Sequence, residues 1–190
     1  MYFPDDMNFQ YFFFSTYPGF FLQALPVALA AGAVFAVRRA RRAPGSSAGK
    51  LALPSLFICY IAGLACLTLF NDILGILYYF LFYRMPSGRR IHWFNLEYDL
   101  VPDFFLRFGS ENLGNIVMFL PFGILYPLYN EQAGWRRTVL TGVVVSVGIE
   151  LLQPVFGRSF DVNDIILNGL GVILSATAYF ALRAVPRRGR

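Results

Sequence analysis

Charged residues are scarce in this 190-residue sequence. Asp, Glu, Lys and Arg together make up 14% of it, whereas about 25% is usual for a soluble domain. Apolar residues reach 57%, and Phe alone occurs 21 times. A water-soluble domain of this size has too much surface relative to its volume to bury so many apolar side chains. The composition therefore excludes an ordinary soluble domain and predicts an integral membrane protein.

Cysteine and histidine are nearly absent as well. Cys59 and Cys66 lie in one apolar run, and on a helix they would be about 10 Å apart, too far for a disulfide. We therefore expect both to be buried free thiols. His92 is the only histidine, so neither a zinc site nor a Ser–His–Asp triad is expected, and no cofactor is predicted.

Basic residues are also missing from the first ten positions, which carry Asp5 and Asp6. A secretory signal peptide begins with a positively charged segment, so none is expected, and the first apolar run should itself direct membrane insertion. The net charge of +5 could suggest a nucleic-acid partner. The basic residues instead lie in short clusters beside apolar runs, which is typical of residues that orient a protein in a membrane. No nucleic-acid partner is therefore predicted.

Long apolar runs are what the sequence has in abundance. A helix needs roughly 20 predominantly apolar residues to cross the hydrocarbon core of a bilayer. Because five runs approach this length, we predict an all-α, polytopic membrane protein with about five transmembrane helices. The runs lie at residues 17–37, 51–70, 113–129, 138–152 and 165–182.

The apolar character continues beyond the second run through residues 71–83, with polar interruptions. A single helix over residues 51–83 would be about 50 Å long, which is much longer than the hydrocarbon core. We therefore predict that the second span ends near Phe70 and that residues 71–83 form an interfacial or re-entrant segment. Residues 84–111 are polar with interspersed aromatics, and such a composition suits a segment at the headgroup level.

The basic residues also predict the orientation. With the N-terminus outside and five crossings, eleven of the sixteen basic residues lie on the cytoplasmic side, and nearly all acidic residues lie outside. The positive-inside rule therefore predicts an outer N-terminus and a cytoplasmic C-terminus, although Arg84, Arg89 and Arg90 would lie outside. On this topology residues 1–83 form a membrane region with two spans and the interfacial segment. Residues 84–190 form a core with an extracytoplasmic segment and three spans.

Eight polar residues lie near the outer ends of the last three predicted spans. Neighbours among them are mostly three or four positions apart, and this spacing places them on one helix face. Polar groups at this depth are costly unless they face each other or water, so we predict an outward-opening polar cavity that binds a ligand. The eight residues are Asn112, Asn115, Glu150, Gln153, Arg158, Asp161, Asp164 and Asn168.

Glu150 is the leading candidate for a functional side chain, because it follows the uncharged stretch 143–149. An isolated carboxylate in a membrane must take up a proton or find a cation, so Glu150 could grip a ligand or act as a general acid or base. The structural alternative is a buried ion pair with Arg158 that orients two helices. Asp161 and Asp164 could equally cap the fifth helix. A Ca²⁺ or Mg²⁺ site on these carboxylates is less well supported, and no metal is predicted.

Two sequence blocks resemble those of VanZ-like membrane proteins. The first has the pattern N-x-x-N-x-x-x-F-x-P-x-G and runs from Asn112 to Gly123. The second has the pattern E-x-x-Q, G-R-x-x-D-x-x-D, N-x-x-G and runs from Glu150 to Gly171. Every position of both patterns is present, and the resemblance extends over about residues 95–179. The Pro121-Phe122-Gly123 break, Gly169 and Gly171 are interpreted as helix-packing features.

The resemblance implies a protein of the bacterial cytoplasmic membrane, mainly of Gram-positive bacteria. The namesake of the family raises resistance to the glycopeptide teicoplanin, which is a phenotype rather than a reaction. Together with the outer polar cluster, this favours a non-catalytic envelope protein whose partners are membrane lipids and a lipid-linked cell-wall precursor or a lipoglycopeptide. The alternative is a small membrane enzyme acting on a lipid head group, with Glu150 as its general acid or base. A proton-coupled carrier is less well supported, because the sequence has no internal repeat.

Overall fold

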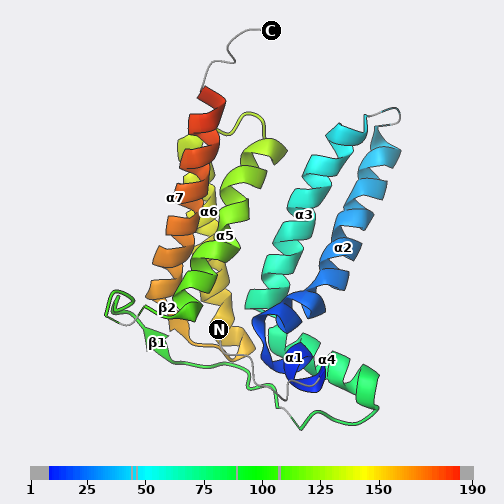
Figure 1. The fold of residues 1–190 in the computed structure, drawn as a ribbon, viewed down its shortest axis with the longest axis vertical. Helices are drawn as coiled ribbons and strands as arrows, with labels where there is room; N and C mark the ends of the chain where they lie inside the picture. Colours follow the sequence, from blue (N-terminus) through cyan, green and yellow to red (C-terminus); the bar gives the residue numbers. More distant parts are fainter. Residues whose placement is uncertain (1–8, 44, 46, 89, 107, 185–190) are drawn as a thin grey trace.

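The computed structural model describes residues 9–43, 45, 47–88, 90–106 and 108–184, and this part of the chain is dominated by helices (Figure 1). This confirms the predicted all-α fold class, and the described residues add one short pair of strands. The elements in chain order are α1 (Phe9–Ser15), α2 (Tyr17–Arg42), α3 (Ala48–Thr68), α4 (Asn71–Tyr83), β1 (Tyr98–Asp99), α5 (Ser110–Tyr129), α6 (Trp135–Leu152), the 3-10 helix η1 (Gln153–Phe156), β2 (Phe160–Asp161) and α7 (Val162–Ala184).

Within the described residues, five helices are long and apolar enough to cross a membrane: α2, α3, α5, α6 with η1, and α7. The prediction of five transmembrane helices is thereby confirmed. Each helix begins or ends a few residues outside the apolar run that predicted it, although α3 ends two residues before its run does. The clearest case is α2, which continues to Arg42 through a basic cluster. Arginine is a good helix former, and its long side chain lets the charge reach the headgroups while the helix continues.

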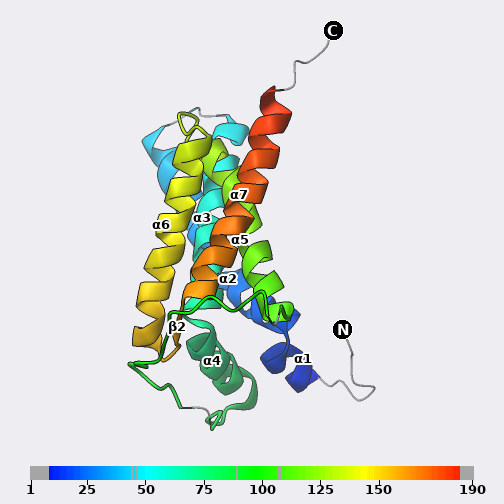
Figure 2. The same cartoon turned by 90° about the vertical axis from the view of Figure 1, so that its left-hand side faces the viewer.

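The second span ends close to the predicted position. Helix α3 ends at Thr68, and α4 begins at Asn71 after a break at Leu69 and Phe70. With 13 residues, α4 is too short to cross the hydrocarbon core. It lies at the same end of the bundle as α1 (Figure 2). One long helix over residues 51–83 is therefore excluded, and the position of α4 fits the predicted interfacial segment.

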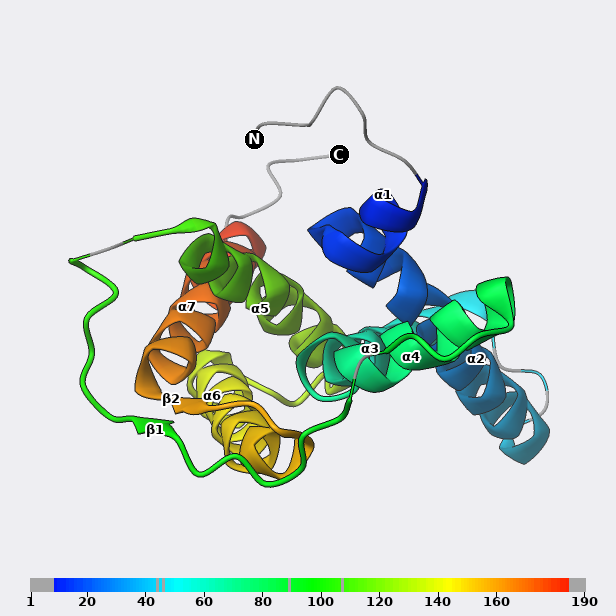
Figure 3. The ribbon, with the colours of Figure 1, turned by 90° about the horizontal axis from the view of Figure 1, so that it is seen from below.

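The transmembrane helices form two groups that meet along α3 and α5. Helix α5 packs along α7, α6 also packs on α7, and α2 pairs with α3 (Figure 3). The two groups are joined by an edge-on contact between Phe57 and Phe122, whose ring centroids are 5.8 Å apart. The Tyr60 hydroxyl donates to the Met118 carbonyl at 2.9 Å across the same interface. Phe122 is fully buried, so the centre of the core lies at this junction.

The close packing of α5 on α7 depends on two glycines. A Cβ atom on Gly123 would overlap the Ser175 hydroxyl, and one on Gly171 would overlap the Ile116 carbonyl. Their interpretation as packing positions is confirmed. Gly169 differs, because a Cβ there would meet its neighbour at 3.5 Å, which is an ordinary contact. The expectation of free thiols is also confirmed, since both cysteines of α3 are unpaired, but only Cys66 is buried, whereas Cys59 is half-buried.

The two ends of the bundle differ in charge. The Arg-rich end of α2 lies at the same end of the bundle as the α5–α6 connection and the end of α7, and the opposite end carries α4, β1 and β2 (Figure 1). This gathering of basic residues is what the predicted orientation requires, and the sidedness itself stays a prediction. Five of the basic residues used for the predicted orientation lie outside the described residues: Arg89, Arg107, Arg187, Arg188 and Arg190.

Candidate ligand-binding site

Residues 90–106, here called the strap, run along the ends of α6 and α7 before the chain enters α5 (Figure 3). Strand β1 of the strap pairs in parallel with β2, and Tyr98 lies opposite Phe160. The Asn95 N–H donates to the Pro154 carbonyl at 2.9 Å, which fastens the strap to η1. The strap therefore closes over the loop that carries Gln153, Arg158 and Asp161 of the predicted site.

Gly157 lets the strap pass close to this loop. Its φ is +81°, a conformation that glycine adopts without strain, and a Cβ there would overlap the His92 carbonyl. The glycine of the G-R-x-x-D-x-x-D pattern is therefore explained by backbone geometry. It places Arg158 at the start of the stretch that leads into β2.

Asn163 ties the strap to the first turn of α7. Its Oδ1 accepts the N–H groups of Asp103 and Phe104 at 2.9 and 3.3 Å. Its Nδ2 donates to Asp103 Oδ1 at 2.9 Å. Asn163 is buried, so these bonds are sheltered from water. The sequence-based site did not include Asn163, although its position between Asp161 and Asp164 at a helix start was a signal for a side chain that binds backbone.

Glu150 lies at the centre of the cluster and is only 1% exposed. Its Oε2 accepts the Asp161 N–H at 3.3 Å. With its amide nitrogen turned toward its acceptors, Gln153 donates to the same Oε2 at 2.9 Å and to the Ser159 carbonyl at 3.3 Å. Two donors from the loop after α6 thus hold one carboxylate oxygen.

Two further polar pairs join α7 to its neighbours. Asn115 of α5 donates from Nδ2 to Asp164 Oδ1. One turn further along α7, Asn168 donates from Nδ2 to the Ser146 hydroxyl of α6 at 3.0 Å. Asn168 is 3% exposed, and its Oδ1 has no hydrogen-bond partner in the described part of the chain. Ser146 belongs to the cluster although the sequence-based site did not include it, and its position one turn before Glu150 could have revealed it.

Arg158 does not form the predicted alternative of a direct ion pair with Glu150 among the described residues. Its Nη1 donates to the Thr68 carbonyl at 3.2 Å, at the last turn of α3. A cation is favourable there because the negative end of the helix dipole and unpaired carbonyls meet it. Arg158 is exposed, and it still interacts electrostatically with Glu150 and Asp164.

Asp161 has the capping role that was one of the two alternatives for it. Its Oδ1 accepts the Asn163 N–H at 2.7 Å, just before the first turn of α7. Burial raises the pKa of the Asp161 carboxyl; the hydrogen bond from Asn163 opposes this, and the charge of Asp99 adds to it. Hydrogen bonds join five of the eight predicted residues, since Asn115 bonds to Asp164 and Glu150 accepts from Gln153 and Asp161. Arg158 acts on Glu150 and Asp164 through its charge, and Asn168 bonds to Ser146. Asn112, at the start of α5, makes no hydrogen bond to them within the described part of the chain.

The cluster is rich in acceptors, and its members Glu150 and Asn168 are closed to solvent, whereas Arg158 is exposed. Its carboxylates and the free Asn168 oxygen suit a ligand that offers hydrogen-bond donors, and the buried Glu150 could also exchange a proton. Among the described residues, no three His, Cys, Asp or Glu side chains are placed to hold a metal ion together. Because Glu150 and Asn168 are buried, a ligand reaches them only if the strap or a helix end moves.

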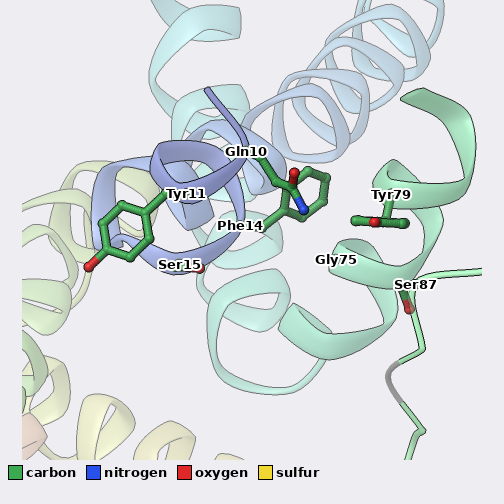
Figure 4. Close-up of a pocket in the computed structure, with 7 residues that line it drawn as sticks. All are labelled: Gln10, Tyr11, Phe14, Ser15, Gly75, Tyr79 and Ser87. Carbon is green, nitrogen blue, oxygen red and sulfur yellow. The ribbon is translucent and has the colours of Figure 1, made fainter. Parts of the chain in front are cut away.

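Two cavities in the described part of the chain lie outside the cluster, because none of its residues lines either one. The larger, of about 450 Å³, lies between α1 and α4, where Gln10 and Phe14 face Tyr79 (Figure 4). The smaller, of about 230 Å³, lies between the strap and the end of α6. The outward-opening cavity between the last three helices stays a prediction.

Comparisons with known proteins identify the family of this chain. Residues 57–183 match the family model described as VanZ/LLP1. Protein VanZ of Enterococcus faecium is 28% identical over 134 residues, which cover 69% of this chain and 75% of that protein. No solved structure matches. The family match includes α5, α6, α7 and every residue of the polar cluster, and the chain therefore belongs to the VanZ/LLP1 family.

Proposed function

We propose that this protein acts in the envelope of a bacterial cell, in the cytoplasmic membrane, by binding a lipid-linked or lipidated ligand at the outer polar cluster. We further propose that this binding contributes to resistance against the glycopeptide teicoplanin. Membership of the VanZ/LLP1 family supports the link to resistance. The charge difference between the bundle ends supports an outer position for the cluster, because basic residues favour the cytoplasmic side.

The observation that carries the proposal is the burial of Glu150 in a membrane-spanning helix. A charged group in such a helix is costly and is usually retained for a function. Both of its hydrogen bonds come to Oε2 from donors of the adjoining loop. The loop that holds Glu150 is also the loop under the strap. Movement of the strap would therefore couple ligand access to the geometry of the carboxylate.

A membrane enzyme remains the alternative function. It is favoured by the electrostatic coupling of Glu150 to Asp164, because neighbouring carboxylates commonly divide the roles of acid and base. In that case Glu150 transfers a proton at the head group of a lipid or cell-wall precursor, and Asp164 orients the substrate. Glu150→Gln would then abolish turnover while preserving binding, whereas unchanged turnover would exclude this role.

The first test is teicoplanin susceptibility in a susceptible Gram-positive host. Wild type, Glu150→Gln and Arg158→Ala are expressed, and the amount of each protein in the membrane is measured. Matched controls are Glu111→Gln and Arg90→Ala, which replace exposed residues of the same type near the same end of the bundle. Both controls should behave as wild type does.

Protection by wild type and by the controls, together with its loss in both cluster variants, would support the proposal. Equal protection by Glu150→Gln and Arg158→Ala would overturn the assignment of the cluster. No protection by abundant wild-type protein would remove teicoplanin resistance from the proposed function. Binding of lipid-linked precursors to the purified protein would then decide whether the cluster binds a ligand at all.

A further inference from the structure

The smaller cavity lies next to the polar cluster along the chain. It is lined on one side by Leu151 and Val155, at the end of α6 and in η1. Leu151 follows Glu150 directly, and Phe160, which also lines the cavity, precedes Asp161. An apolar cavity and a buried acceptor-rich site therefore share the same short segment of backbone.

The opposite wall of the cavity is the strap. Phe94 and Tyr98 line it, and Tyr98 pairs with Phe160 at a ring-centroid distance of 6.0 Å. Phe94 has a φ of +60°, which is unusual for a bulky residue. Its N–H donates to the Val155 carbonyl at 3.4 Å, so the strained residue is held against η1. Strain of this kind persists where the surrounding structure requires one conformation.

Lipid is the medium beside this cavity. Leu151 and Val155 belong to the membrane-spanning segment Trp135–Phe156, and the Leu151 side chain is 62% exposed. On the strap, Phe94 and Leu96 are 72% and 76% exposed, although both are large and apolar. At about 230 Å³ the cavity is smaller than the usual pocket for a whole small molecule. Its size and apolar wall suit a narrow aliphatic chain.

The adjoining cluster has hydrogen-bond acceptors that could bind further donors. Glu150, Asp161 and Asp164 are acceptors when ionised, and the buried Asn168 Oδ1 is an acceptor without a partner in the described part of the chain. Arg158 is the cation that acts on Glu150 and Asp164, and it is already bonded to the Thr68 carbonyl. A head group bearing an amine satisfies such a site better than a phosphate does.

We propose that the ligand is an amphiphile whose amine-bearing head binds the Glu150 cluster and whose aliphatic chain occupies the cavity between the strap and the end of α6. This deepens the proposed function and rests on it. Acceptors on α6 and α7 bind the amine-bearing head, while the aliphatic chain of the ligand enters from the bilayer past Leu151. The strap closes over both parts of the ligand.

The test uses the full chain in lipid nanodiscs with a long-chain primary alkylamine that carries a diazirine near the end of its chain. After irradiation, labelled peptides are identified by mass spectrometry at increasing concentrations of unlabelled alkylamine. Leu151→Trp fills the cavity, and Leu140→Trp is the matched control, because Leu140 is 66% exposed on the same helix but does not line the cavity. Val155→Trp is a second filling variant, and thermal unfolding confirms that each protein is folded.

We expect saturable labelling of peptides from the strap and from residues 151–160, and only non-saturable labelling around Leu140. Filling the cavity should weaken saturable labelling about tenfold or more, because the displaced part of the chain loses its apolar burial. Leu140→Trp should leave it unchanged. Butylamine, which has the head but no long chain, should compete poorly.

Several outcomes would overturn the inference. Labelling that does not saturate, or that persists in folded Leu151→Trp and Val155→Trp, would show that the aliphatic chain does not bind in this cavity. If Glu150 and Arg158 are nevertheless needed for teicoplanin protection, the proposed function stands and only this inference fails. Saturable labelling that is unaffected by Glu150→Gln would separate the chain site from the cluster and would likewise contradict the inference.

Discussion

At the residue scale, Glu150 accepts two hydrogen bonds from the loop that follows its own helix. Its Oε2 binds the Asp161 N–H and, through the oriented amide, Gln153. Both donors are themselves sheltered, since Gln153 is 3% exposed and Asp161 is half-buried. The carboxylate therefore organises the turn into β2, whatever ligand it binds.

Two substitutions of Glu150 distinguish the contribution of its side-chain volume to stability from that of its charge. Glu150→Ala should lower the free energy of unfolding by about 2–4 kcal/mol, because it leaves two buried donors unpaired and creates a cavity. Glu150→Gln keeps the volume and one acceptor, so its loss should be clearly smaller. Thermal unfolding of the purified protein in detergent would measure both, with Glu111→Ala as the exposed control. Equal stability of wild type and Glu150→Ala would show that the network contributes nothing to the fold.

At the scale of elements, α5 and α7 approach closely because Gly123 and Gly171 lack side chains. The approach brings Asn115 to Asp164, so the polar network depends on this packing. Within α7, the Ser175 hydroxyl donates to the Gly171 carbonyl one turn earlier at 2.8 Å. Helix packing through small residues is usual where lipid, rather than water, surrounds the helices.

Gly123→Ala should therefore force α5 away from α7. We expect a loss of about 1–3 kcal/mol in unfolding free energy, which is typical of overpacking a tight contact. Gly148→Ala is the matched control, because nothing lies within 4 Å of a Cβ there and alanine favours a helix. Unfolding of both variants in the same detergent would test this. Similar stabilities of the two variants would contradict the packing role of Gly123.

At the same scale, Asn163 holds the strap against the first turn of α7. Asn163→Ala removes the acceptor of the Asp103 and Phe104 N–H groups. Amide hydrogen exchange at these two positions should accelerate about tenfold or more, because a sheltered hydrogen bond is lost. Asn112→Ala, which removes a side chain without a hydrogen bond to the cluster, should leave the exchange unchanged. Unaltered protection in Asn163→Ala would mean that β1 and η1 alone hold the strap.

At the scale of the whole molecule, five crossings place the polar cluster and the arginine-rich helix ends on opposite sides (Figure 1). The cluster end also carries the strap and α4, so most of the structure outside the spans is on one side. The prediction of an outer N-terminus therefore makes this the extracytoplasmic face. The division into regions 1–83 and 84–190 stays a prediction, and the family match at residues 57–183 begins within α3, before that boundary.

Cysteine labelling would test the orientation directly. In a variant with both native cysteines replaced by serine, Ser159→Cys should react with a membrane-impermeant maleimide in intact cells. Gln132→Cys, in the α5–α6 connection, should react only after the cells are permeabilised. Both positions are exposed, so access to reagent rather than burial decides the result. The reverse pattern would invert the topology and place the polar cluster in the cytoplasm.

The sequence by itself determined the number of spans, their approximate bounds and the identity of most cluster residues. A bilayer needs about 20 apolar residues per helix, which is a local property of the chain, and polar residues within such runs stand out against it. The break at Phe70 was equally visible, because one helix through residues 71–83 would have been too long.

Only the tertiary structure decided which of these residues touch. Asn115 meets Asp164 across 49 positions of sequence, and Arg158 binds the end of α3, 90 positions away, instead of Glu150. Asn163 became important only when the strap came to lie on α7. Helix rotation, glycine-dependent spacing and the path of the strap set these contacts. None of the three follows from local periodicity, because each depends on how separate helices pack.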